Sequence, residues 1–512
     1  MGSRSRRRDR NRTTPRALDG ACPIRAGMEG GRFQPLTEHD VQRIHQTSLD
    51  VLENYGMADP TDSCRELLLS NGCFLNDRGR LCFPRTLVED VIADCGRGFT
   101  LHARNPEFDL DVSGARVHFS GSTAAINVLD IDTGHYREAL LGDVYDLARA
   151  QDAMENLHFV HRPCIARDMP NSHMLDLNTA YAMMSATDKH FVTSFFEPEH
   201  LIEAVQMFDV SLGREGSYKQ RPFSMLVCAF VVSPLRFAGD SCRTLEAAVA
   251  SGMPIWTASA AQAGATSPTA LAGALMQGNA ECLAALVYIN LLAPRHPVVM
   301  GNWPFVSDLR NGSFSGGGGE IGLLNAAAVQ LSRFYDIPVT VGAGMTDSKS
   351  ADVQSGWEKG YLTAMCGLAG GNLLGGGIGG HASLMGFSVE SLVIDNDMLG
   401  AVLRTVRGIE VNDDTLSYEV IGKVIDGPGH YLTQPQTFER MASDYVYPKI
   451  GNRDTIDVWE EKGQPDIREA AKQRAREILN SHFPSHIDKQ MDDLIRTRFD
   501  IRLPRERMRP LA

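Results

Sequence analysis

Aromatic residues stand directly after two of the short apolar runs in the sequence, where they could bind a cationic group. Phe196 follows one run, and Trp303 and Phe305 follow another. The π face of an aromatic ring attracts a quaternary ammonium ion, and each desolvated contact contributes roughly 0.5–2 kcal/mol. Core packing is the competing interpretation, because neighbouring strand residues face opposite ways and only one of Phe195 and Phe196 can line a site. We expect Trp303, together with Phe196 or Phe305, to form the cationic site.

Glycine-rich segments in two places could hold an anionic group. Four consecutive glycines precede Glu320 at the expected start of a helix, and three more follow the last apolar run. Glycine lets backbone amides come close to a ligand, and the N-terminus of a helix favours negative charge. Tight turns between packed elements are the alternative reason for such glycines. We predict that amides near Gly344 and Gly377, helped by His381, bind a substrate carboxylate.

Carboxylates near these glycines are the candidate catalytic groups. Asp347 follows the seventh apolar run, and Glu320 adjoins the four glycines. Both would add negative charge beside a bound cation, although Glu320 could equally be an acidic residue that a helix N-terminus favours. His158 and His161 form a close histidine pair, but their odd spacing on a strand puts them on opposite faces. We therefore predict no metal site.

Eight short apolar runs alternate with helical segments, and this alternation predicts a series of βα units. The runs are Ala124–Leu129, Phe159–Ile165, His190–Phe195, Ser224–Phe230, Pro254–Ala258, Pro297–Gly301, Pro338–Gly342 and Asn372–Gly376. Eight parallel strands, each followed by a helix, close into a TIM barrel whose active site lies in the loops after the strands. The first run is the least regular, since residues 130–134 could instead turn a hairpin. The candidate residues would thus meet at one end of a barrel.

The chain divides into four predicted regions. They are a disordered basic tail at 1–34, a helical N-terminal domain with short strands at 35–119, the TIM barrel at 120–433 and a helical C-terminal extension at 434–512. The tail is polar and lacks the apolar stretch of a secretory signal. The predicted fold class is therefore α/β, a TIM barrel with helical additions at both ends.

The composition argues against several kinds of partner. The 512 residues carry a net charge of −13 without acidic blocks, which disfavours binding to nucleic acid or to anionic membranes. The sequence contains no apolar run long enough to span a membrane. The ten cysteines include no CxxC pair, which is typical of free thiols in a reducing cytoplasm. We expect a cytoplasmic protein and, as is common for large barrels, a homo-oligomer.

Several dispersed motifs resemble the trimethylamine methyltransferase family, in its branch without pyrrolysine that includes glycine betaine methyltransferases. They are His118 to Ser122, Ser315 to Glu320, Gly344 to Lys349 with Asp352 and Gln354, Ser391 to Asp395, Gly427 to Leu432, and Tyr445 to Pro448. The resemblance covers about residues 35 to 480. It implies a TIM barrel and the transfer of a methyl group from an amine to the cobalt of a separate corrinoid protein. The cobalamin would belong to that partner, with no cofactor bound tightly by this chain.

The absence of pyrrolysine bears on the expected substrate. The family's founder carries this residue, thought to handle trimethylamine, whereas this chain has only standard residues. A neutral tertiary amine is a poor leaving group until its nitrogen becomes cationic, but a quaternary ammonium ion already carries that charge. The site then needs no general acid and has only to desolvate and align the methyl donor. The expected donor is glycine betaine or a related betaine, with Glu320 and Asp347 on its cationic side.

Two other functions fit the sequence. The glycine loops after the seventh and eighth strands could bind a phosphorylated small molecule, as in many TIM-barrel enzymes, although Lys349 lies some residues beyond its strand. A betaine-binding protein without catalysis is the second alternative. It would bind the same ligands tightly but transfer no methyl group to a reduced corrinoid.

Overall fold

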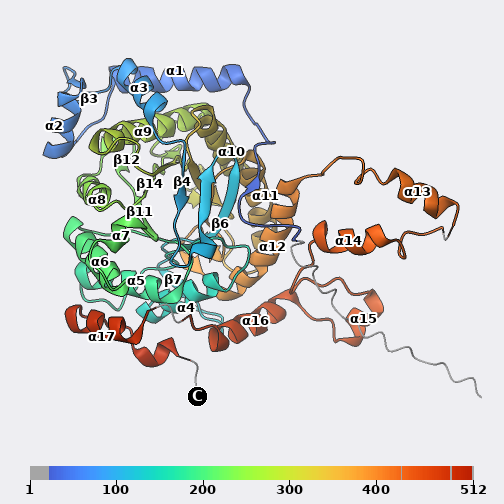
Figure 1. The fold of residues 1–512 in the computed structure, drawn as a ribbon. Helices are drawn as coiled ribbons and strands as arrows, with labels where there is room; N and C mark the ends of the chain where they lie inside the picture. The colour runs from blue at the N-terminus through green and yellow to red at the C-terminus, as the bar shows by residue number, and fades with distance from the viewer. Residues whose placement is uncertain (1–21, 428, 485–486, 510–512) are drawn as a thin grey trace, which may run out of the picture.

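A computed structural model describes residues 22–427, 429–484 and 487–509. Within these residues the centre of the molecule is a curled, nine-stranded sheet surrounded by helices (Figure 1). In sheet order the strands are β1 (Met28–Glu29), β6 (Arg116–Ser122), β20 (Leu373–Gly376), β19 (Val339–Ala343), β16 (Val298–Gly301), β14 (Ile255–Thr257), β11 (Ser224–Cys228), β10 (Phe191–Thr193) and β9 (Val160–His161). Only β1 pairs antiparallel, and all the other neighbours in this sheet are parallel, as βα units require.

The two ends of the curled sheet lie against each other, because the chain around β9 is hydrogen-bonded to the chain around β6. The His158 amide donates to the carbonyl oxygen of Phe119 at 2.7 Å, and the Ala124 amide donates to that of Arg162 at 2.9 Å. These bonds satisfy backbone groups that would otherwise be exposed at the two edges.

The prediction of a first strand at Ala124–Leu129 is wrong. The parallel set begins with β6, and the later segment forms β7 (Asn127–Leu129), which pairs antiparallel with β8 (Tyr136–Glu138). The chain thus forms the hairpin that the sequence offered as the alternative. β6 overlaps the short strands expected before residue 120, but it was not predicted as part of the parallel set. Polar residues such as His118 and Ser120 occupy buried positions and interrupt its apolar pattern.

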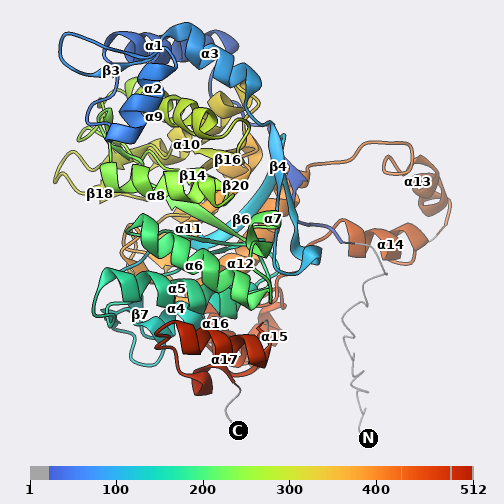
Figure 2. The ribbon, with the colours of Figure 1, turned by 60° about the vertical axis from the view of Figure 1, so that its left-hand side comes forward.

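Helices cover the outer face of the curled sheet (Figures 1 and 2). They are α4 (Leu141–Asp152), α5 (Ser172–Ala186), α6 (Pro198–Ser211), α8 (Gly239–Ala250), α9 (Leu271–Leu292), α10 (Gly319–Phe334), α11 (Val353–Ala369) and α12 (Val389–Arg407). Side chains that accept hydrogen bonds from first-turn amides fix several of their starts. Asn171 accepts from Met174 at 2.9 Å, and Asp352 accepts from Ser355 at 2.8 Å. The predicted alternation of strand and helix is confirmed from β9 onward.

α9 is the one described helix that is long and apolar enough to cross a membrane. In this structure 78% of its most apolar window is buried inside the molecule. Apolar residues all around a helix are what a fully enclosed position in the core requires. α9 is therefore a core helix of this fold.

The N-terminal helices pack over α9 on one side of the molecule. α1 (Glu38–Asn54), α2 (Asp62–Ser70) and α3 (Arg85–Asp94) all contact it. Thr37 fixes the start of α1 by accepting a hydrogen bond from the amide of Asp40. The helices expected in this region are confirmed, and they extend the core beyond the curled sheet.

A hairpin of β4 (Gly98–Leu101) and β5 (Leu110–Ser113) closes the end of the sheet at which the strands begin. His190, just before β10, donates from Nδ1 to the carbonyl oxygen of His102 at 2.6 Å. Apolar residues of the hairpin pack with strand residues in one buried cluster of Leu101, Leu110, Val112, Phe159, Val192, Met225, Trp256, Val299, Trp303 and Leu373. A ligand must therefore enter from the other end, where the strands finish.

The C-terminal helices wrap the body. α16 (Ile467–Ser481) packs against α12 and α4, and α17 (Lys489–Arg498) packs against α6. Arg149 fixes α16 by donating hydrogen bonds of 2.8 Å to the carbonyl oxygens of Leu479 and His482.

Between α12 and α16 the chain leaves the body as an arm (Figures 1 and 2). The arm comprises residues 409–427 and 429–447 and contains α13 (Tyr418–Ile425) and α14 (Pro435–Ser443). α15 (Ile456–Glu461) follows it before the chain returns to the body.

The expected basic tail at 1–34 lies partly outside the described residues, which exclude residues 1–21. Within the described part, Met28 and Glu29 form β1 and pair with Val117 and Arg116 of β6. This part of the region is therefore an edge of the central sheet.

Candidate functional site

Asp347 lies in the loop after β19 and is held by three hydrogen bonds. Its Oδ1 accepts from the Gly316 amide and from Ser383 Oγ, each at 2.6 Å, and its Oδ2 accepts from Ser315 Oγ at 2.7 Å. Burial raises the pKa of this carboxyl, but the hydrogen bonds outweigh burial and the pKa lies below its ordinary value. Asp347 is therefore a fixed negative charge at neutral pH.

A second carboxylate, Glu358 on α11, holds the backbone of Asp347 in place. Glu358 is buried and its Oε2 accepts hydrogen bonds from Thr346 Oγ1 at 2.5 Å and from the Asp347 amide at 2.8 Å. Gln354 Nε2 donates to the other oxygen at 2.9 Å. A Cβ atom at Gly317 would lie 2.2 Å from the carboxyl carbon of Glu358, so only glycine fits there. The sequence analysis assigned Glu358 no role and included Gln354 only in a motif.

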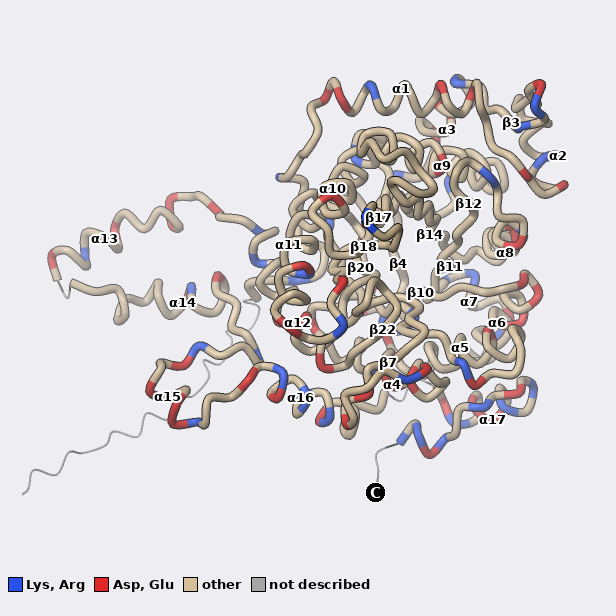
Figure 3. The backbone as a smooth tube through the Cα atoms, turned by 180° about the vertical axis from the view of Figure 1, so that it is seen from behind, with Lys and Arg blue, Asp and Glu red and all other residues tan. Residues whose placement is uncertain are grey.

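A cleft of about 550 Å³ opens beside Asp347. It is lined by Asp308, Arg310, Asn311, Ser313, Phe314, Ser315, Asp347, Lys349, Ala382, Ser383 and Met385. One wall is the hairpin of β17 (Phe305–Ser307) and β18 (Phe314–Ser315), which lies over one end of the curled sheet (Figure 3). The cleft thus combines two carboxylates, Asp347 and Asp308, with one aromatic ring and two cations, Lys349 and Arg310. Arg310 is ion-paired with Asp308 at 2.8 Å.

Glu320, the other predicted catalytic carboxylate, borders a neighbouring cleft of about 400 Å³. It is exposed in the first turn of α10. Asp308, Arg310 and Ser315 line both clefts, so the hairpin of β17 and β18 adjoins each of them. The structure therefore brings Glu320 and Asp347 near one hairpin but into two separate spaces.

The aromatic residues after β16 form a connected group under this hairpin. Trp303 is buried, with its ring centroid 6.4 Å from that of Phe305 and 5.8 Å from that of Trp256. Phe305 in turn lies 4.4 Å from Phe314, which reaches the Asp347 cleft. Trp303 and Phe305 are thus brought together as expected. The sequence analysis missed Trp256 and Phe314, although Trp256 stands in a predicted strand.

Phe196 does not join this group. Its side chain is 52% exposed, and its amide donates to Asp176 Oδ2 at 2.7 Å. Of the two aromatic partners expected for Trp303, Phe196 or Phe305, the ring contact is therefore with Phe305. Its neighbour Phe195, which like Phe196 follows the end of β10, is the buried member of the pair.

The glycines after β19 and β20 serve packing. A Cβ atom at Gly377 would lie 2.1 Å from the carbonyl carbon of Gly344, and one at Gly344 would lie 2.4 Å from Ile378 Cδ1. Gly344 also has a φ of +70°, which favours glycine. The Gly377 amide already donates to the Ala343 carbonyl oxygen at 3.1 Å. The predicted carboxylate site at Gly344 and Gly377 is corrected accordingly, because these residues close the turns.

One ring nitrogen of His381 is hydrogen-bonded inside the protein. His381 is fully buried, and its Nε2 lies 2.6 Å from Ser391 Oγ on α12. Burial holds the pKa of the imidazole well below its ordinary value, so the ring is neutral. The other ring nitrogen, Nδ1, is buried without a hydrogen-bond partner in the described part of the chain. No contact tests whether His381 helps to bind a substrate carboxylate, so this role stays a prediction.

A buried ion pair holds the loop that follows β20. Lys359 Nζ on α11 lies 2.7 Å from Asp395 Oδ2 on α12, and that oxygen also accepts from the Gly379 amide at 2.7 Å. Burial raises the pKa of Asp395, against the effect of Lys359. The pair ties two helices to the loop that follows β20.

Several buried side-chain atoms of the described strands and of the loop after β16 have no hydrogen-bond partner. Among the described residues, His161 Nδ1, Trp303 Nε1 and Thr340 Oγ1 are buried and have no hydrogen-bond partner. The His161 ring lies edge-on to Trp256 at 5.5 Å, and burial lowers its pKa to about 3. Unsatisfied buried polar groups cost free energy, so in native structures they usually meet water or a ligand.

Metal ligands do not gather in the part of the chain that the structure describes. No three His, Cys, Asp or Glu side chains come together there in a way that could hold an ion. His158 accepts a hydrogen bond from the Phe119 amide at 3.2 Å, whereas His161 packs on Trp256.

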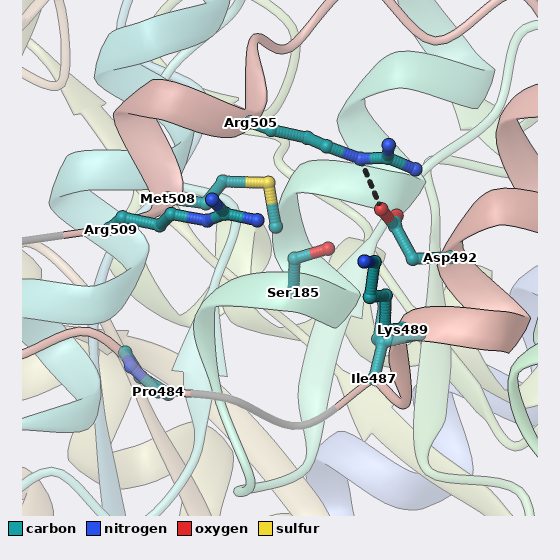
Figure 4. A pocket seen from close by; sticks show the side chains of 8 residues that line it. All are labelled: Ser185, Pro484, Ile487, Lys489, Asp492, Arg505, Met508 and Arg509. Carbon is teal, nitrogen blue, oxygen red and sulfur yellow. Dashed lines mark hydrogen bonds and ion pairs between the residues drawn. The ribbon is translucent and has the colours of Figure 1, made fainter.

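A third cleft lies far from the strand ends, beside α17 (Figure 4). It has a volume of about 230 Å³ and is lined by Ser185, Pro484, Ile487, Lys489, Asp492, Arg505, Met508 and Arg509. Ser185 is near the end of α5, the helix that leads into β10, so this cleft is at the level where the strands begin. It does not belong to the Asp347 site.

Comparison with known proteins identifies the class of activity. The chain is 29% identical over 462 residues to the glycine betaine methyltransferase of Desulfitobacterium hafniense, covering 90% of this chain and 95% of that protein. It is 30% identical over 473 residues to the trimethylamine methyltransferase MttB of Methanosarcina barkeri, covering 90% and 93%. The protein is a methyltransferase.

The family follows from a match along almost the whole chain. The family model described as trimethylamine methyltransferase (MTTB) matches residues 2–503, and the chain belongs to this family. The crystal structure of the Methanosarcina barkeri monomethylamine methyltransferase aligns over 91% of this chain and 95% of that one, with 12% identity and a TM-score of 0.48, a likeness too low to argue from.

Proposed function

We propose that this enzyme transfers a methyl group from a quaternary amine, glycine betaine or a related betaine, to the cobalt of a corrinoid carried by a separate protein. The observation that carries the proposal is the Asp347 cleft, in which an ionised carboxylate and the ring of Phe314 face one space. Both attract a cation that has lost its water. The sequence relationship to a glycine betaine methyltransferase supports the same donor class.

The ends of the substrate would bind opposite charges. The trimethylammonium head lies against Phe314 and Asp347, with Phe305 and Trp303 behind the ring. The carboxylate end lies toward Lys349 and Arg310, which replace Gly377 in this role.

The reaction needs positioning more than acid–base catalysis. The corrinoid supplies the electron pair that forms the new cobalt–carbon bond. The carbon–nitrogen bond breaks with its electrons going to nitrogen, so a neutral tertiary amine leaves without receiving a proton. The task of Asp347 and the aromatic rings is to hold the cation dry and aligned while its charge disappears. Glu320 adds negative charge at the neighbouring cleft.

The fold that we propose for this chemistry is a TIM barrel with helical additions. Eight parallel strands and the hydrogen bonds between the chain around β6 and that around β9 support it. The barrel would then begin with β6, at Arg116, a few residues before the boundary expected at 120. The open end is the one where active sites of such barrels lie.

The corrinoid protein would dock over that open end. Exposed apolar side chains surround it on β17–β18, α10 and α11, namely Leu309, Leu323, Val353 and Trp357. Val353 is 87% exposed and stands at the first position of α11. An exposed apolar group at a rim is typical of a protein-binding surface. A reduced corrinoid requires a reducing compartment, and the free thiols of all ten cysteines support a cytoplasmic location.

The direct test mixes the purified enzyme with cob(I)alamin and glycine betaine, proline betaine, carnitine or trimethylamine, and follows methylcobalamin by absorbance. We expect product from one or more of the betaines and none from trimethylamine. Absence of alkyl cobalt with every cationic donor would refute the function.

Phe314→Leu tests the cationic site. Loss of one cation–π contact, about 1 kcal/mol, raises KM for the betaine roughly 5-fold. Phe196→Leu is the matched control, because Phe196 lies outside the aromatic group, and its KM should not change. Equal changes of KM in the two variants would contradict the placement of Phe314 in the cationic site.

A further inference from the structure

The cleft beside α17 is built from three segments and takes no part in the proposed methyl transfer (Figure 4). α5 supplies Ser185, α17 supplies Lys489 and Asp492, and the 3₁₀ helix η2 (Arg505–Met508) supplies its two end residues. The volume of about 230 Å³ is smaller than the roughly 300–1,000 Å³ of pockets for drug-sized molecules. The cleft therefore fits a compact ligand.

The walls of this cleft are held by contacts within the protein. Tyr181, one turn before Ser185 on α5, donates a hydrogen bond from its hydroxyl to Asp492 Oδ1 on α17. Arg496, also on α17, contacts the sulfur of Met508 at 3.5 Å. These contacts join α5, α17 and η2 to one another, so the cleft is formed before a ligand binds.

Two of the four charged side chains that line the cleft compensate each other. Asp492 Oδ2 accepts hydrogen bonds from Arg505 Nε at 2.8 Å and from Arg496 Nε at 3.2 Å. Arg505 also forms an ion pair with Asp493. The two aspartates and two arginines are therefore neutral as a group.

Lys489 and Arg509, the other two charged side chains of the lining, keep their positive charge uncompensated. Neither forms an ion pair with a carboxylate in the part of the chain that the structure describes. Asp488 precedes Lys489, but its side chain accepts from the Gln490 amide at 2.8 Å and does not line the cleft, nor does Glu506. Two positive charges that face one space are best compensated by a dianion.

Ser185 gives an independent indication of a ligand. Its side chain is 2% exposed, and its Oγ has no hydrogen-bond partner among the described residues. In Figure 4 the hydroxyl points into the cleft, between the ends of Lys489 and Arg509. A buried hydroxyl without a partner costs free energy, and an anion in the cleft would accept its hydrogen bond.

We propose that this cleft binds the phosphoryl group of a small molecule, with Lys489, Arg509 and the Ser185 hydroxyl as donors. An ammonium, a guanidinium and a hydroxyl that donate into one space suit the several acceptor oxygens of a phosphoryl group. A phosphorylated hydroxyl carries a charge of about −1.5 to −2 at pH 7, which matches the two cations. Ile487 and Met508 present apolar surface for the remainder of the ligand. The proposal does not depend on the identity of the methyl donor.

Calorimetric titration with inorganic phosphate, at constant ionic strength set with chloride, tests the site. We expect one phosphate to bind saturably per chain, and Lys489→Ala with Arg509→Ala to weaken binding about 10-fold or more, as the loss of two charged contacts implies. Lys423→Ala with Arg498→Ala is the matched control, because both side chains are exposed outside the cleft and the change in net charge is the same. No saturable binding to the wild-type protein, or equal weakening in both double variants, overturns the proposal.

Ser185→Ala separates contact with the ligand from a role in the fold. Because Ser185 Oγ has no partner in the described protein, the phosphate-free variant should have the same Tm as the wild-type protein or a higher one. The rise in Tm that inorganic phosphate causes should be smaller in the variant than in the wild-type protein. An undiminished rise in Ser185→Ala contradicts the placement of this hydroxyl in the site.

A dicarboxylate distinguishes a phosphoryl site from a site for any dianion. Malonate is titrated in the same way as inorganic phosphate. We expect malonate to bind several-fold more weakly, since its charge is divided between two carboxyl groups whereas Lys489, Arg509 and Ser185 face one space. Malonate binding as tight as that of phosphate contradicts the phosphoryl assignment.

Discussion

Asp347 keeps its charge over the whole neutral and mildly acidic range. Its hydrogen bonds hold the pKa below the ordinary value of 3.8, so the carboxylate and the stability that it contributes are lost only when pH falls below that value. We expect kcat/KM for a quaternary amine to show no inflection from this group between about pH 5 and about pH 8. A pH profile of methyl transfer to cob(I)alamin measures this. An acidic limb above pH 5 that disappears in Asp347→Asn would contradict it.

Removing the charge of Asp347 tests its role directly. Asp347→Asn keeps the shape of the side chain but removes the anion, and we expect kcat/KM for betaine to fall roughly 10- to 100-fold. Asp77→Asn, at an exposed turn, is the control and should leave the rate unchanged. Similar rates in both variants would remove Asp347 from the cationic site.

Glu358 acts through Asp347 and Thr346. Glu358→Ala leaves two buried donors without their acceptor, and we expect the free energy of unfolding to fall by about 2–4 kcal/mol. Glu358→Gln retains an acceptor oxygen and should lose much less. Urea unfolding followed by circular dichroism compares the two. Equal losses would mean that volume, not hydrogen bonding, matters at this position.

The sequence predicted some of these residues because strand ends indicate where side chains gather. Asp347, Trp303 and Phe305 lie near one hairpin for that reason. Gly377 and His381 also follow a strand, but sequence does not reveal that the Gly377 amide and Nε2 of His381 already have partners inside the protein. Likewise, no local pattern indicates that a chain segment folds back over the strand ends, which is how Phe314 reaches the cleft.

Among the elements, α11 and α12 depend on one buried ion pair. Lys359→Met leaves Asp395 charged, buried and without its cation, and we expect a loss of about 3–5 kcal/mol in the free energy of unfolding. Adding Asp395→Leu should recover part of that loss, limited by the Gly379 amide, which then lacks an acceptor. A thermal or urea unfolding series on both variants measures this. A double variant less stable than Lys359→Met would refute the coupling.

The central elements could largely be predicted because buried parallel strands are short, apolar and separated by amphipathic helices. β10, β11, β14, β16, β19 and β20 all lie within or overlap the predicted runs. β6 could not be recognised as a strand of the central sheet, since a strand that buries His118 and Ser120 lacks that pattern. The pairing of β17 with β18 was also missed, as both are two or three residues long.

At the scale of the whole molecule, the proposed docking surface of Leu309, Leu323, Val353 and Trp357 is distinct from the Asp347 cleft, so binding of the partner and the chemical step can be tested separately. Trp357 is 55% exposed on α11 and does not line the Asp347 cleft. We expect Trp357→Glu to slow methyl transfer to a corrinoid protein by 10-fold or more, roughly the effect of losing an aromatic anchor, and to leave transfer to free cob(I)alamin unchanged. Parallel assays with the two acceptors measure the difference. A matching loss with free cob(I)alamin would contradict the docking surface.

The hairpin of β4 and β5 at the closed end of the sheet has a consequence for turnover. One end of the interior is closed by Leu101, Leu110 and Val112. Substrate and product must therefore pass through the end where the strands finish. Under the proposed function, the demethylated amine could not leave while the corrinoid protein covers the open end. Each cycle would then require the two proteins to separate, so the rate of their dissociation would set an upper limit on the turnover rate.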